Sequence, residues 1–79
     1  METIVLDTEN EVCPALSSAV RVCITRNLES LKLGTSQLIV ISSEPSLDSK
    51  VKNILDFNNL TVSKEIKNKI VYLLIKIKQ

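Results

Sequence analysis

The segment that most constrains the fold is the run at residues 70–77, IVYLLIKI, because apolar residues stand on both of its alternating faces. It is the most apolar segment of the chain and predicts a strand. Helices packed on a sheet cover only one of its faces, so the second apolar face of this strand is expected to serve as a partner surface. The two sets of residues are Val71, Leu73, Ile75 and Ile77 on one face and Ile70, Tyr72 and Leu74 on the other.

Three further strands are predicted before this run. Residues 3–6 (TIVL) are short and β-branched, and residues 38–41 (LIVI) form a continuous apolar run that suits a central strand. Residues 60–66 alternate along the chain, and residues 67–69 (KNK) predict a hairpin turn between them and residues 70–77. The last two strands are therefore expected to pair antiparallel.

Two helices are predicted between the strands. Pro14 fits the first position of the first helix, where its missing N–H costs nothing, and Gly34 is expected in the turn that ends this helix. The second helix is predicted over residues 48–58, with Asn58-Asn59 supplying the left-handed residue at its end. Both segments carry an inner stripe at helical spacing. The stripes are Leu16, Ala19, Val20, Cys23, Ile24, Leu28 and Leu31 in the first helix and Val51, Ile54, Leu55 and Asn58 in the second.

This order of elements predicts an α+β fold, a two-layer sandwich in which two helices cover one face of a four-stranded mixed sheet. A chain of 79 residues can form one domain with a modest core, and a single domain over residues 1–79 is expected. A right-handed crossover makes the first two strands parallel, either adjacent or separated by another strand. Both a monomer and a weak homodimer through the open sheet face fit the pattern.

Composition excludes several classes of function. The net charge is +1 and the only aromatic residues are Phe57 and Tyr72, which argues against binding nucleic acid by charge or by stacking. No apolar run approaches the ~20 residues of a membrane span, and the N-terminus lacks the basic start of a signal peptide, so a cytoplasmic protein is expected. The chain has two cysteines and no histidine, so neither a metal site nor a cofactor is expected.

Cys13, directly before Pro14, is the strongest candidate for a chemically active residue. At a helix N-terminus, free backbone N–H groups and the positive end of the helix dipole favour the thiolate. The carboxylates of Asp7, Glu9 and Glu11 oppose this effect if they come close to the thiol.

Cys23 has the opposite character, because it lies on the apolar stripe and is expected to pack in the core. A disulfide between Cys13 and Cys23 is not expected. Ten residues of helix separate two positions by roughly 15 Å, whereas a disulfide needs Cα atoms within about 7 Å.

In this order of elements the chain resembles the TusA/SirA-like sulfur carriers over nearly its whole length. The family pattern is a strand, Leu-Asp, a short loop, Cys-Pro, a helix, a glycine turn, an apolar strand, acidic residues before a proline, a second helix and a closing hairpin. The matching motifs here are Leu6-Asp7, Cys13-Pro14, Gly34, residues 38–41, Glu44-Pro45 and residues 72–76. The chain departs from the pattern at Leu16, where the family has a second proline, at Asn10, where it usually has glycine, and at Ser43, where it has a second acid.

The resemblance implies a sulfurtransferase that works as a sulfur-relay protein, in which Cys13 accepts a persulfide sulfur from a donor protein and passes it to an acceptor protein. Pro14 and Ala15 would support the first helix turn beside the cysteine. Glu44 is interpreted either as a partner contact or as part of the turn before the second helix. Arg21 is either a partner contact or part of a solvated helix face. Two other functions stay open: a protein-binding module without sulfur chemistry and, on fold analogy alone, an RNA-binding domain.

Overall fold

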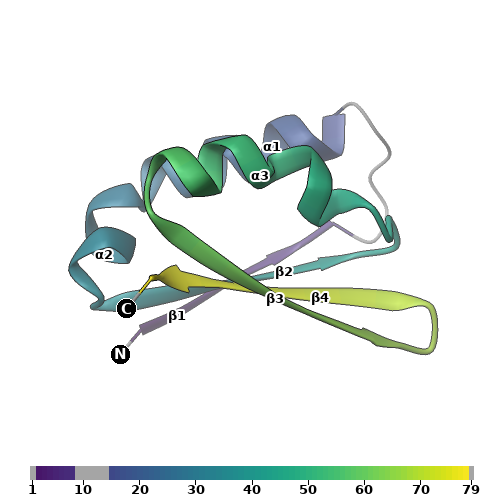
Figure 1. Ribbon diagram of the computed structural model, residues 1–79. Coiled ribbons are helices and arrows are strands. Elements are labelled where there is room, and N and C mark those ends of the chain that lie inside the picture. Colours follow the sequence, from purple (N-terminus) through teal and green to yellow (C-terminus); the bar gives the residue numbers. More distant parts are fainter. Residues whose placement is uncertain (1, 9–14, 79) are drawn as a thin grey trace.

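A computed structural model of the chain describes residues 2–8 and 15–78. Strands and helices alternate along these residues before a closing hairpin, as Figure 1 shows. All four predicted strands are present, and the last of them spans residues 70–77 as predicted. The elements are β1 (Glu2–Asp7), α1 (Ala15–Arg26), α2 (Leu28–Leu33), β2 (Ser36–Ser42), α3 (Leu47–Phe57), β3 (Leu60–Lys67) and β4 (Ile70–Ile77).

The four strands form one open mixed sheet in the order β1-β2-β4-β3. β1 and β2 pair in parallel, and β4 pairs antiparallel with both β2 and β3. The adjacent parallel pair is one of the two arrangements predicted for the strand–helix–strand unit. β2 and β4 are the inner strands of the sheet, which agrees with their continuous apolar sequences.

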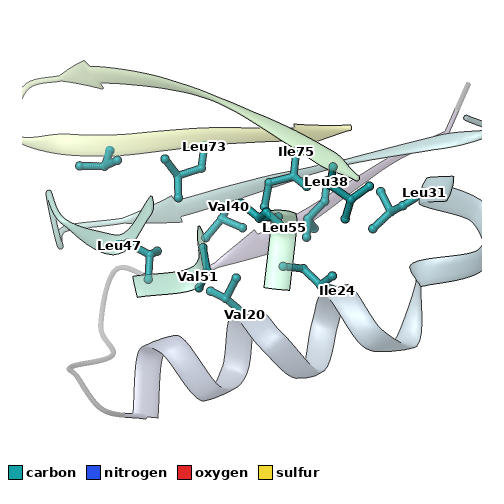
Figure 2. Packing of buried hydrophobic residues seen from close by; sticks show 12 residues of the cluster. Val20, Ile24, Leu31, Leu38, Val40, Leu47, Val51, Leu55, Leu73 and Ile75 are labelled. Atoms are coloured by element: carbon teal, nitrogen blue, oxygen red, sulfur yellow. The ribbon is translucent and has the colours of Figure 1, made fainter. Parts of the chain in front are cut away.

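The helices all cover the same face of the sheet (Figure 1), so the predicted two-layer α+β sandwich is confirmed. Alternate residues of the inner strands point into the layer beneath the helices, as Figure 2 shows for Leu38, Val40, Leu73 and Ile75. These side chains meet the inner stripes of α1 and α3. The buried hydrophobic core consists of Val20, Ile24, Leu31, Leu38, Val40, Leu47, Val51, Leu55, Leu60, Val71, Leu73 and Ile75.

The first helical segment, expected as one helix up to Gly34, is divided at Asn27 into α1 and α2. Asn27 has φ −110° and ψ 13°, outside the α-helical region. Its Nδ2 donates to the carbonyl oxygen of Cys23 at 2.9 Å, and its backbone N–H is shared between the carbonyl oxygens of Cys23 and Ile24, each at 3.2 Å. A side-chain amide that bonds the carbonyl four residues back bends a helix. The bend brings α2 against β2 and β4, where Leu31 is fully buried.

Left-handed residues follow two of the helices. Gly34 has φ 78° and ends α2, where its N–H donates to the carbonyl oxygen of Leu31 and the N–H of Thr35 donates to that of Ser30. Asn59 has φ 58° and follows α3. The turn predicted at Gly34 and the left-handed residue predicted within Asn58-Asn59 are therefore confirmed.

The hairpin between β3 and β4 turns on Asn68 and Lys69, both with positive φ (51° and 67°). Such a two-residue turn favours Asn-Gly, and a side chain in the left-handed region costs about 1 kcal/mol. We expect Lys69→Gly to raise the free energy of unfolding by roughly 1 kcal/mol and Tm by several degrees, measured by thermal denaturation. Lys67→Gly, at the last residue of β3, is the control and should lower Tm, since glycine weakens a strand. A lower Tm in both variants would contradict strain at Lys69.

Candidate functional site

The two central residues of the predicted site, Cys13 and Pro14, lie outside the described residues. The structure is described up to Thr8, just after β1, and again from Ala15, the first residue of α1. The surroundings of the site are therefore given by the elements on either side of this segment.

The carboxyl ends of β1 and β2 lie at the same end of the sheet as the amino ends of α1 and α3, on the right in Figure 1. Functional sites of layered α/β folds gather at such an end, because helix N-termini present unpaired backbone N–H groups there. This end of the molecule, called the helix-start end below, consists of Thr8, residues 42–46, the first two turns of α1, the first turn of α3 and Lys64 of β3.

Two buried hydroxyl residues hold the strand ends at the helix-start end. The backbone N–H and the Oγ1 hydroxyl of Thr8 both donate to the carbonyl oxygen of Ile41, each at 2.7 Å, and Thr8 is only 1% exposed. The Oγ of Ser42, which is fully buried, accepts from the backbone N–H of Glu44 at 2.9 Å. Because these bonds are sheltered from water, they fix the points at which the chain leaves β1 and β2.

Glu44 closes the turn before α3. Its Oε1 accepts from the hydroxyl of Ser46 at 2.8 Å and from the backbone N–H of Ser46 at 3.3 Å, and its Oε2 lies 4.0 Å from the Nζ of Lys50. The two Ser46 hydrogen bonds and, to a smaller extent, the Lys50 charge lower the pKa of the Glu44 carboxyl. Glu44 therefore takes part in the turn, and its exposed side remains accessible to a partner.

We expect the stabilisation by Glu44 to vanish in acid. Since its folded-state pKa is lowered, the carboxylate stabilises the fold above its unfolded-state pKa, near 4.5, and this contribution is lost as the pH falls through the folded-state pKa. Glu44→Gln should lower Tm slightly at neutral pH and leave it unchanged in acid below the folded-state pKa. Thermal denaturation at the two pH values measures this, and an equal loss at both would contradict the role of the charge.

Arg21 links the two long helices at their surface. Its Nη2 donates to the carbonyl oxygen of Lys50 in α3 at 3.2 Å. The Nζ of Lys50 faces Glu44, so the two predicted partner contacts, Arg21 and Glu44, both touch this one residue. The structure thus brings them to the same region of the surface, where charges of both signs are exposed.

Cys23 has a free thiol and packs against the core, as predicted, although it is only partly buried. It lines a shallow groove with Leu6 of β1 and Val22 of α1. The Nδ2 of Asn27 approaches its Sγ at 3.8 Å. Burial raises the pKa of Cys23, and the Asn27 hydrogen bond and the Arg26 charge offset this only in part. Its thiol is therefore mostly protonated at neutral pH and a weak nucleophile.

Sequence reasoning does not identify Thr8, Ser42 or Lys64 as parts of the helix-start end. The Nζ of Lys64, from β3, donates to the carbonyl oxygen of Pro45 at 2.8 Å and lies 3.4 Å from the Oδ1 of Asp48. Ser42 directly follows the apolar run 38–41, and Thr8 comes two residues after the run that ends at Leu6, which is a local signal. The Lys64 contact joins residues 19 positions apart and depends on the register of β3, so no local pattern indicates it.

Among residues 2–8 and 15–78, no three histidine, cysteine, aspartate or glutamate side chains are grouped as a metal site requires. In the same part of the chain, no helix has the length and apolar character needed to cross a membrane. Comparisons with protein-family models, with curated proteins and with solved structures find no match to this chain.

Proposed function

We propose that this chain is a sulfur carrier, in which Cys13 accepts a sulfur atom as a persulfide from a donor protein and passes it to an acceptor protein. The observation that supports this function is the position of α1, which starts at Ala15, two residues after Cys13 in the chain. The resemblance to the TusA/SirA-like sulfur carriers rests on the same order of strand, Cys-Pro pair and helix.

A helix start favours an anion such as a thiolate or a persulfide. Its first backbone N–H groups have no partner within the helix, and the helix dipole is positive there. α1 is 12 residues long and has no acidic residue in its first turn, so no carboxylate of that turn competes for these N–H groups. A thiolate favoured in this way needs no histidine as a base.

The proposed transfer is a thiol–persulfide exchange. The Cys13 thiolate attacks the terminal sulfur of the donor persulfide, a new S–S bond forms as the donor S–S bond breaks, and the donor leaves as a thiolate. The proton on the terminal sulfur either stays there or passes to water. A thiolate of the acceptor then attacks the terminal sulfur on Cys13 in the same way. Each step exchanges one S–S bond for another, so the transfer consumes no external oxidant or reductant.

Donor and acceptor are proposed to approach the helix-start end in turn, because both must reach the same sulfur atom. Arg21, Glu44, Lys50 and Lys64 lie there with charges of both signs. Such a surface suits a protein partner better than a nucleic acid, which requires mainly positive charge. The reducing cytoplasm, where thiols persist, is the compartment proposed for this relay.

The test is the gain of one sulfur atom. The reduced wild-type chain, incubated with a cysteine desulfurase and cysteine or with polysulfide, is expected to gain the mass of one sulfur in intact-mass spectrometry and to lose it on reduction. Desulfurase without cysteine is the control. A chain that gains no sulfur from either donor is not a sulfur carrier. Partner binding retained by Cys13→Ser would then identify a protein-binding module.

A further inference from the structure

The face of the sheet opposite the helices has an apolar centre. Val5, Ile39 and Leu74 are register neighbours on β1, β2 and β4, and Ile41 and Tyr72 are paired one step further along β2 and β4. By alternation these side chains point away from the helix layer. Val5 is 59% exposed, and among the described residues no helix lies over this face (Figure 1). These five residues are called the open-face centre below.

Polar side chains surround the open-face centre. The Nε2 of Gln37 donates to the Oγ1 of Thr3 at 3.1 Å, and the Nζ of Lys67 lies 3.3 Å from the Oε1 of Glu65. An apolar centre with a polar rim is the usual composition of a protein–protein interface. The polar residues of the rim are Thr3, Asp7, Gln37, Thr61, Ser63, Glu65, Lys67 and Lys76, and Ile70 adds one apolar residue at the start of β4.

A hollow of about 680 Å³ lies on the same face. Ile39, Tyr72 and Leu74 contribute its apolar lining, and Gln37 and Glu65 lie at its border among the polar residues. Side chains from an opposing surface can therefore enter between the rows, as they do where two sheets pack face to face about 10 Å apart.

We propose that the open-face centre binds a second copy of this chain, so that two copies pack sheet against sheet. The Cα atoms span 31 × 22 × 17 Å and the strands run along the length of the molecule (Figure 1), so a face that contains the long axis carries about a sixth to a fifth of the 4998 Å² of accessible surface, roughly 800–1,100 Å². A standard interface takes about 800 Å² from each partner. The dimer does not depend on sulfur chemistry.

Symmetry gives this face a self-complementary arrangement. A twofold axis that crosses the strands at the row of Val5, Ile39 and Leu74 brings each of these residues against its own counterpart. Apolar side chains then meet apolar side chains along the whole row. Val5, which is exposed on the edge strand β1 of a single chain, would be buried against Val5 of the second copy in this dimer.

The same axis brings two opposite charges of the rim together, those of Lys76 and Glu65. Lys76 lies one step from Leu74 along β4, and Tyr72 lies one step in the other direction, paired with Glu65 on β3. The twofold therefore lays Lys76 of each copy over Tyr72 of the other copy and next to its Glu65. This places a cation on an aromatic ring and beside a carboxylate, twice per dimer. The rim carries two lysines, Lys67 and Lys76, against two carboxylates, Asp7 and Glu65, so it has no net positive charge to attract RNA as the occupant.

Sedimentation velocity in the presence of a reductant tests the proposal over about 1 to 500 µM chain. The wild type is expected to change from monomer to dimer over this range. Val5→Lys should raise the dissociation constant at least about tenfold, because the twofold brings two added charges together. Phe57→Lys is the matched control, since Phe57 is 88% exposed at the end of α3, and should leave the dissociation constant unchanged.

A charge exchange tests the pairing. Lys76→Glu and Glu65→Lys should each weaken the dimer several-fold, and the double variant should return to near the wild-type dissociation constant. A chain that stays monomeric throughout, including one that binds an RNA or another protein through this face, overturns the proposal. A dimer that Val5→Lys does not weaken overturns it as well, and a double variant no better than the single ones overturns the twofold pairing.

Discussion

Leu38→Ala is expected to lower the free energy of unfolding by about 3 kcal/mol and Tm by roughly 15 °C. Leu38 is fully buried in β2 and lies within the packed cluster of Figure 2. Its register neighbours, Ile4 on β1 and Ile75 on β4, are held by the strand ladder on both sides, so the cavity left by truncation collapses poorly. A domain of this size has a total stability of roughly 4–12 kcal/mol, so the loss is a large part of it.

Ile66→Ala is the matched control for Leu38→Ala. Ile66 lies on β3 and is 53% exposed, so truncating this side chain should cost less than about 1 kcal/mol. Urea denaturation followed by circular dichroism measures both variants, with the denaturant slope expected to stay constant. Equal losses of stability in the two variants would contradict a core centred on β2.

The strands are predictable from the sequence because their signals are local. Apolar residues on both faces of residues 70–77 predict β4. Alternating residues before a turn at Asn68 predict β3 and the hairpin. The antiparallel closing pair then follows from chain order, whereas crossover handedness leaves open whether the first two strands are adjacent or separated by another strand. Helix α3 starts at Leu47, one residue before the predicted start, and that residue is fully buried.

The bend between α1 and α2 is not predictable in the same way. The inner stripe runs on through Ile24, Leu28 and Leu31, as it would in one straight helix. The helix is divided where the Asn27 side chain donates a hydrogen bond to the Cys23 carbonyl oxygen. The spacing of apolar residues in the sequence does not indicate this hydrogen bond. The packing of α2 on the sheet favours the bent form.

The site shows the same division between local and long-range information. A turn role is one of the two interpretations that the place of Glu44 before Pro45 and Ser46 allows, and the structure gives it two hydrogen bonds to Ser46. The Lys64 contact with the Pro45 carbonyl and the convergence of Arg21 and Glu44 on Lys50 require the finished fold. A sequence pattern can therefore predict which residues belong to the helix-start end, but it does not predict the contacts between them.

The transferred sulfur is expected on Cys13 and not on Cys23. Cys13→Ser should lose the whole gain of one sulfur atom, whereas Cys23→Ser should keep it at the wild-type level, as measured by intact mass after incubation with donor. Cys23 lies inside α1, where backbone N–H groups are already bonded within the helix, and burial raises its pKa. At neutral pH it therefore supplies little thiolate to attack a persulfide.

The two variants control each other, because each removes one sulfur atom and leaves the other cysteine in place. Serine at position 23 keeps an oxygen that can accept from the Asn27 amide, so Cys23→Ser should fold normally by circular dichroism. The reverse result, with sulfur retained in Cys13→Ser and lost in Cys23→Ser, would show that Cys23, in the groove between α1 and β1, is the residue that carries the sulfur. In that case the low thiolate fraction at Cys23 should make loading rise steeply with pH, whereas loading on a thiolate favoured by a helix start should depend on pH much less.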